Sequence, residues 1–104
     1  MPYRSWSYGA GYASVARVSD RQGSPHPWLR ALGVHLRKER EARGLTVEQL
    51  AEAADVSVRQ LSRIEAGRGS PSVLWLLSVA GGLGIRPSEL LGRVEKDRDT
   101  GPLN

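Results

Sequence analysis

Side chains suited to reading DNA bases lie together between residues 57 and 63. Arg59 and Arg63 are spaced by one helical turn, and Gln60 follows Arg59. Arginine can donate two hydrogen bonds to guanine, glutamine can pair with adenine, and a valine can contact a thymine methyl. If residues 57–66 form a helix, Leu61 and Ile64 face inward and the others face outward. The residues expected to contact bases are Ser57, Val58, Arg59, Gln60, Ser62 and Arg63. The competing interpretation is a solvated amphipathic helix.

Other chemistries find little support in the sequence. The chain has no cysteine and no glycine-rich phosphate loop, and His26 and His35 are its only imidazoles. His26 lies between two prolines, and His35 is expected to be solvated on the polar side of a helix. Two separate histidines do not make a metal site. We therefore expect no enzymatic activity, no metal, no cofactor and no small-molecule ligand.

Composition narrows the class of partner and the compartment. Fifteen basic and eleven acidic residues give a formal charge of +4, which weakly favours a polyanionic partner. No apolar run approaches the roughly 18 residues of a membrane span, and no signal peptide is recognisable. We expect no membrane association and a cytoplasmic protein, associated with the bacterial nucleoid when bound to DNA.

Two capping signals position the candidate base-reading residues. Residues 46–49 (TVEQ) and 57–60 (SVRQ) both match the capping box that begins a helix. The first predicts a helix ending near Asp55, which is expected to adopt a left-handed backbone conformation, and the second predicts a helix running to about Ala66. Because about three residues join the two helices, they must cross steeply, with Ala51 at the crossing.

Three further helices complete the predicted domain. Leu29, Leu32 and Leu36 mark one face of a helix that runs to about Arg43 and stops at Gly44. Ser70 and Pro71 are predicted to open a fourth helix that closes at Gly84. Residues 88–91 form a short fifth helix. The fourth helix is expected to turn inward Val73, Leu76, Leu77, Val79, Ala80 and Leu83. The predicted fold is all-α, with five helices.

The periodic aliphatic residues divide the chain into three parts. Residues 28–91 form the predicted folded domain, and residues 92–104 a frayed tail. Residues 1–27 are rich in Ser, Gly and Tyr, and we predict a flexible arm there. Its arginines and aromatic residues could follow a DNA backbone, or the arm could be an unstructured tail without a fixed role.

The pattern resembles the phage-repressor (lambda-repressor-like, Cro/cI or XRE) helix-turn-helix family. The resemblance covers about residues 32–91 and rests on residues 45–51 (LTVEQLA), 56–57 (VS), 61–67 (LSRIEAG) and 71–72 (PS). It implies that residues 57–66 are the recognition helix, and that Arg59 and Arg63 occupy positions that often contact bases. Family members also contact phosphates at positions matching Thr46, Val47, Arg68 and Ser70. Arg40 and Glu65 match a pair that joins the first helix to the recognition helix, the alternative being two independent surface charges.

Three residues depart from the family pattern. Val47 replaces a common glutamine, so its phosphate contact is expected to be missing, and Asp55 replaces the usual turn glycine. Leu74 and Trp75 stand where relatives tend to be polar, which predicts an exposed apolar patch. A homodimer or a protein partner could cover it, or the Trp28 segment or the N-terminal arm could fold over Trp75.

The combined expectation is a sequence-specific regulator of transcription that binds double-stranded DNA as a homodimer on a palindromic operator. The alternative is an antitoxin or adaptor that uses the same fold to bind a protein.

Overall fold

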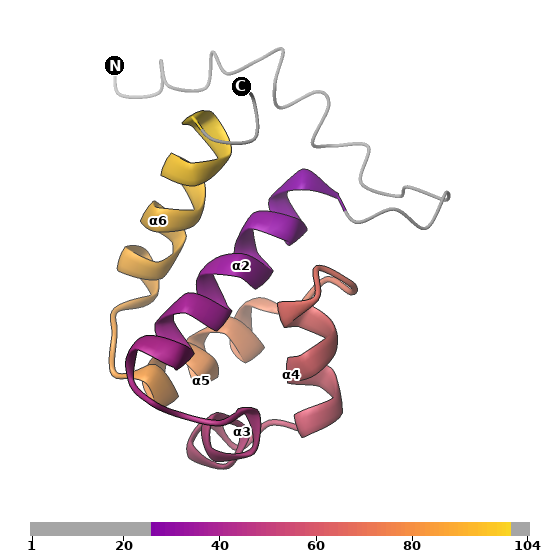
Figure 1. Cartoon of the computed structure of the whole chain (residues 1–104), viewed down its shortest axis with the longest axis vertical. Helices are drawn as coiled ribbons and strands as arrows, with labels where there is room; N and C mark the ends of the chain where they lie inside the picture. The colour runs from indigo at the N-terminus through magenta and orange to yellow at the C-terminus, as the bar shows by residue number, and fades with distance from the viewer. Residues whose placement is uncertain (1–25, 101–104) are drawn as a thin grey trace.

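Five helices make up the part of the chain that the structure describes, residues 26–100 of a computed structural model (Figure 1). They are α2 (Pro27–Ala42), α3 (Val47–Ala54), α4 (Val58–Glu65), α5 (Val73–Leu83) and α6 (Pro87–Thr100), and these residues contain no strand. The predicted all-α class and the predicted number of helices are confirmed. No helix in this part of the chain has both the length and the apolarity that crossing a membrane requires.

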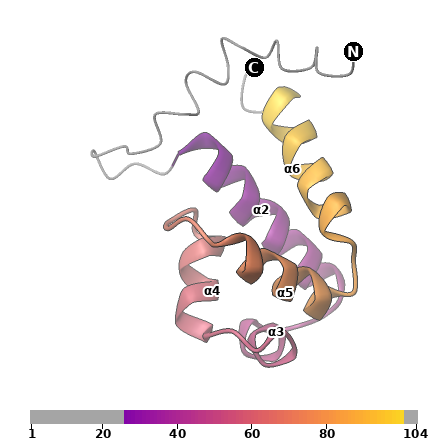
Figure 2. The same cartoon turned by 180° about the vertical axis from the view of Figure 1, so that it is seen from behind.

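Every helix contributes at least one fully buried side chain to the core. The largest of them, each less than 2 % exposed, are Leu36, Leu50, Leu61, Val79 and Leu90. Helix α2 packs against α6 along one side and against α4 on another, while α3 packs on α5 and α4 (Figures 1 and 2). Because every helix buries a residue in one cluster, the packing of α4 depends on the whole fold.

The first helix begins earlier than predicted. His26 is its N-cap, with Nδ1 accepting a hydrogen bond of 3.2 Å from the backbone N–H of Trp28, and Pro27 occupies the first turn. Both residues were assigned to the arm, so that boundary was too late by two residues. The remainder of the predicted arm, residues 1–25, lies outside the described residues. The helix ends close to the expected place, at Ala42 with Arg43 as its C-cap, and Gly44 has the expected left-handed conformation with φ of 69°.

The start of α5 differs from the prediction. Its N-cap is Ser72, whose Oγ accepts a hydrogen bond of 3.1 Å from the N–H of Trp75, so neither Ser70 nor Pro71 opens the helix. The expected end is confirmed, since Gly84 is the left-handed C-cap with φ of 75°.

The buried face of α5 was predicted correctly only in part: Val79, Ala80 and Leu83 are buried as expected, but Val73 and Leu77 are not. Trp75 is 7 % exposed and belongs to the core with Val79, whereas Val73 and Leu77 point outward at 72 % and 46 % exposure. The helix has apolar residues on nearly every side, so its periodicity does not define an inward stripe. Packing against α3 instead decides which face of α5 points inward. Gly82 of α5 lies so close to α3 that a Cβ added to it would be 3.0 Å from the Cβ of Ala54.

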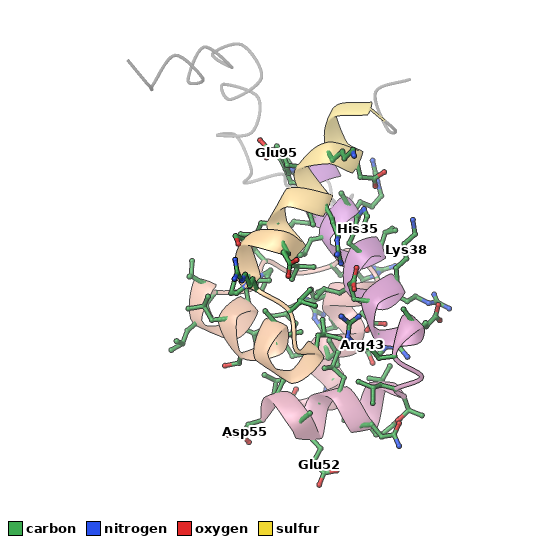
Figure 3. All side chains as sticks on the ribbon, turned by 90° about the vertical axis from the view of Figure 1, so that its left-hand side faces the viewer. His35, Lys38, Arg43, Glu52, Asp55 and Glu95 are labelled. Atoms are coloured by element: carbon green, nitrogen blue, oxygen red, sulfur yellow. The ribbon has the colours of Figure 1, made fainter. Side chains whose placement is uncertain are left out.

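The last helix is longer than predicted and extends to Thr100, through most of the segment assigned to a frayed tail. Val94 is 3 % exposed in the core cluster. Arg93 donates a hydrogen bond to Glu39, and Asp97 Oδ2 lies 3.4 Å from Nε2 of His35. His35 is therefore not solvated: its side chain is 14 % exposed and lies between α2 and α6 (Figure 3). These contacts with α2 stabilise a segment whose own sequence is mostly polar.

Candidate nucleic-acid interface

Two capped helices joined by a tight turn form the candidate site. The capping box at the start of α3 is complete: Thr46 Oγ1 accepts from the N–H of Gln49 at 3.0 Å, and Gln49 Oε1 accepts from the N–H of Thr46 at 2.9 Å. Asp55 ends the helix in the predicted left-handed conformation, with φ of 57° and ψ of 48°. The N–H of Val56 then bonds to the carbonyl of Ala51 at 3.0 Å, which closes the turn.

The N-terminus of α4 carries only half of the second predicted capping box. Ser57 Oγ accepts from the N–H of Gln60 at 2.9 Å, but in the described part of the chain no reciprocal bond from the Gln60 side chain accompanies it. The Gln60 side chain therefore stays available for contacts outside the protein, although the helix still begins where predicted.

Helix α4 separates its residues into a buried and an exposed face. Leu61 and Ile64 are 0 % and 3 % exposed and anchor the helix on the core. The exposed face gathers all six residues that the sequence assigns to base contacts, Ser57, Val58, Arg59, Gln60, Ser62 and Arg63. Polar and cationic groups thus project together from a helix narrow enough to enter a major groove.

The four residues expected to contact phosphates lie beside this face, and they differ in how exposed they are. Thr46, Arg68 and Ser70 are exposed, at the start of α3 and in the loop after α4. Val47 is half-buried, and its side chain packs against the core. Arg63 lies against the same loop as Arg68, because a Cβ on Gly69 would be 3.5 Å from Arg63 Nη2.

Arg40 and Glu65 form an ion pair behind the exposed face. Arg40 Nε donates to one carboxylate oxygen of Glu65 at 2.8 Å and Nη2 donates to the other at 2.9 Å, while Nη1 donates to the carbonyl of Leu45 at 2.9 Å. The side chains are 11 % and 7 % exposed. The hydrogen bonding to Glu65 raises the pKa of Arg40 above its ordinary value.

The distribution of charge favours an anionic partner at α4. Arg59, Arg63 and Arg68 are exposed there, whereas the carboxylate of α4, Glu65, is bound to Arg40. On α3, Glu52 projects away from the body of the protein (Figure 3), and Asp55 lies in the turn before α4. An anion approaching α4 would meet three cationic side chains.

The apolar patch expected at Leu74 and Trp75 has a different composition. Trp75 is buried, so it cannot contribute, but Leu74 is 72 % exposed on the same helix as Val73 and Leu77. We refer to Val73, Leu74 and Leu77 as the α5 strip. Because Trp75 is buried, it is not part of the exposed patch. Val73 and Leu77, which were expected to face inward, are exposed beside Leu74 instead.

One residue near α4 was not predicted from the sequence. Gly33 is buried in α2 and faces the carbonyls of Ile64 and Glu65 at the end of α4. A glycine inside a helix can mark a close approach of backbones, but only the tertiary structure shows what approaches.

The fold and the paired helices define an all-α helix-turn-helix domain. A helix-turn-helix family model matches residues 36–90, more than half of the chain. The chain therefore belongs to the helix-turn-helix family of the phage-repressor (Cro/cI) type.

Curated relatives and solved structures support this membership. The chain is 45 % identical over 60 residues to the HTH-type transcriptional regulator DdrOP3 of Deinococcus deserti, covering 58 % of this chain and 46 % of that protein. It is 43 % identical over 61 residues to the immunity repressor protein of Bacillus phage phi105, covering 59 % and 42 %. The chain thus spans less than half the length of these two relatives.

Among solved structures, the clp gene regulator ClgR of Corynebacterium glutamicum is 34 % identical with a TM-score of 0.67, covering 73 % of this chain and 81 % of that one. The restriction-modification controller protein C.AhdI of Aeromonas hydrophila is also 34 % identical, with a TM-score of 0.59, covering 60 % and 94 %.

Proposed function

We propose that this protein is a sequence-specific DNA-binding regulator of transcription that inserts α4 into the major groove of duplex DNA. The observation that carries the proposal is the exposed face of α4, where six side chains of types suited to base contacts are exposed. The turn at Asp55 holds one end of this helix, and the Arg40–Glu65 pair holds the other. The regulatory names of similar proteins support the same function.

The exposed residues make two kinds of contact with DNA. Arg59 and Gln60, near the N-terminus of α4, meet base edges and supply sequence preference, with Ser57 and Val58 beside them. Ser62 and Arg63 extend this face. Phosphate contacts come from Thr46, the backbone of Val47, Arg68 and Ser70, and they fix register without reading sequence.

We further propose that the regulator binds a palindromic operator as a homodimer through the α5 strip. Val73 and Leu74, both 72 % exposed, are large apolar side chains on α5, which contains none of the residues proposed to contact DNA. Two-fold pairing would place two copies of α4 about one turn of DNA apart, roughly 34 Å. Sedimentation of the native protein and of Leu74→Ser tests this. We expect a concentration-dependent dimer that Leu74→Ser weakens, and a native monomer at all concentrations would contradict it.

The α5 strip also supports a second candidate function. An antitoxin or adaptor with this fold would use Val73, Leu74 and Leu77 to bind a different protein. Such an apolar interface would respond little to salt, whereas phosphate contacts make DNA affinity fall steeply with salt.

Fluorescence anisotropy with labelled duplex DNA at several salt concentrations separates the two functions. We expect a steep, linear fall of log affinity with log salt concentration, and we expect Arg68→Ala to reduce the slope by about 1. Lys38→Ala is the matched control, because Lys38 is an exposed cation on α2 outside the proposed interface. Absence of duplex binding at low salt would favour the protein-interaction function.

A further inference from the structure

Helix α2 approaches the C-terminal end of α4 at Gly33 more closely than any side chain would permit. A Cβ atom at position 33 would lie 2.5 Å from the carbonyl oxygen of Ile64, 2.6 Å from that of Glu65 and 2.9 Å from the carbonyl carbon of Glu65. All three atoms belong to the backbone of α4. The contact therefore cannot be relieved by rotating a side chain, and the two helices would have to separate.

The end of α4 is fixed by its own hydrogen bonds. The carbonyl of Ile64 accepts from the N–H of Gly67 at 2.9 Å, and that of Arg63 accepts from the N–H of Arg68 at 2.9 Å. Gly67 has φ of 80°, the left-handed conformation that ends a helix. Because this turn holds the carbonyl of Ile64, that carbonyl cannot tilt away from α2 without breaking the turn.

Gly33 and Arg40 act on the same junction between helices. They are seven residues apart, which places them on one face of α2 about two turns apart. The contact at Gly33 sets how close α2 and α4 come, and the Arg40–Glu65 bonds of 2.8 and 2.9 Å tolerate little change in that separation. Even a Cβ contact of 3.0 Å would require the helices to separate by about 0.5 Å at Gly33.

We propose that Gly33 is a positioning residue for sequence recognition, which sets the orientation of α4 through direct backbone contact. This inference rests on the proposed function. Arg59 and Gln60 project from the same short helix, and hydrogen bonds to base edges need placement to about 0.5 Å. Gly33 thereby controls discrimination between DNA sequences without touching DNA.

The test compares Gly33→Ala with two matched variants, all as full-length protein. Gly82→Ala introduces milder crowding at another helix junction, between α5 and α3, with the added Cβ at 3.0 Å from Ala54 Cβ and 3.1 Å from its N. Gly92→Ala changes helix propensity alone, since no atom lies within 4 Å of its added Cβ. For each we measure unfolding in urea, affinity for the operator selected by the native protein, and affinity for random duplex.

We expect Gly33→Ala to lower operator affinity about tenfold while random-duplex affinity changes less than about twofold. Gly82→Ala and Gly92→Ala should leave the ratio of the two affinities unchanged, whatever their stability. Equal losses on both DNAs, or an unchanged ratio in folded Gly33→Ala, would overturn the inference. So would a comparable loss of ratio in Gly82→Ala.

Combination with Arg40→Lys tests whether both residues act on one junction. Lysine keeps the charge but loses the bidentate contact to Glu65. We expect the operator-to-random ratio of Gly33→Ala with Arg40→Lys to fall by less than the product of the single effects. Independent, multiplying effects would overturn the inference.

A measurement on the unaltered protein does not depend on whether Gly33→Ala folds. Residual dipolar couplings of backbone amides give the angle between α2 and α4, free and bound to operator. We expect the same angle in both states, because the junction is rigid before DNA arrives. A change of angle on binding would overturn the inference. If the unaltered protein shows no operator preference, the proposed function itself fails, and this inference fails with it.

Discussion

Arg40 of α2 and Glu65 of α4 lie 25 residues apart in the sequence, yet they meet through two parallel hydrogen bonds of 2.8 and 2.9 Å. A third bond from Arg40, to the carbonyl of Leu45, adds the segment that leads into α3. One guanidinium group thus joins the first helix, the start of the helix-turn-helix and the end of α4. The bidentate geometry matches the planar fork of arginine, which lysine cannot reproduce.

Removing Arg40 alone should destabilise the protein strongly. We expect Arg40→Met to cost about 3 kcal/mol, because Glu65 stays mostly buried without its partner. Replacing both residues, as Arg40→Met with Glu65→Leu, should recover much of that loss, since no unpaired charge remains. Urea unfolding measures both variants. A single variant as stable as the native protein would show that the ion pair adds no net stability.

Trp75 should behave as a core residue. We expect Trp75→Ala to cost about 3–5 kcal/mol, because the ring is 7 % exposed and its removal leaves a large cavity. The adjacent Leu74→Ala should change monomer stability by less than about 0.5 kcal/mol, because Leu74 is 72 % exposed. Unfolding in dilute solution compares them. Similar costs for the two variants would contradict the assignment of Trp75 to the core.

Asp55 should be replaceable by glycine without loss of stability. Its φ of 57° is left-handed, which strains a residue with a Cβ but not glycine. We expect Asp55→Gly to be about 1 kcal/mol more stable than Asp55→Ala, which cannot use a short polar side chain to support the turn. Thermal unfolding compares the stabilities of these two variants. Equal stabilities would show that the turn changes conformation and so relieves the strain at residue 55.

Glu39 should contribute to acid sensitivity. Burial alone would raise the pKa of Glu39, but hydrogen bonds and charge interactions with Arg43 and Arg93 outweigh burial, and the pKa lies below its ordinary value of 4.5. A carboxyl group with a lowered pKa in the folded state stabilises the protein above the ordinary pKa, and this stability disappears as pH falls through the folded pKa.

We therefore expect the unfolding free energy of the native protein to fall more between pH 6 and acid pH than that of Glu39→Gln. Urea unfolding over that range measures both proteins. Parallel pH profiles would mean that the contacts of Glu39 with Arg43 and Arg93 add no net stability.

Arg59 should determine sequence preference. We expect Arg59→Ala to lose roughly 1–3 kcal/mol of binding free energy on the selected operator and little on random duplex. Anisotropy titrations at one fixed salt concentration compare the two DNAs. An equal loss on both would assign Arg59 to a phosphate.

Local signals explain which elements were predictable. Thr46 and Gln49 form a capping box within one turn, and Gly44 and Asp55 end their helices through their own backbone conformations. Such features need only neighbours in the sequence, so the helix-turn-helix was predicted with close bounds. The outward face of α4 followed from the spacing of Leu61 and Ile64.

Tertiary contacts explain the errors. Trp75 and Leu77 exchanged faces because an apolar helix such as α5 is oriented by what packs on it, here through Gly82. The extension of α6 depends on contacts that α2 supplies, and His35 is covered by that extension. Gly33 was missed because its neighbours, the carbonyls of α4, lie more than 30 residues away.

Selection from a pool of random duplex DNA tests the central claim most directly. The native protein is incubated with the pool at near-physiological salt, and the retained fragments are sequenced. Our account predicts enrichment of a palindrome whose half-sites lie about one helical turn apart. Retention of fragments without any shared sequence, or no retention, would contradict sequence-specific recognition by α4.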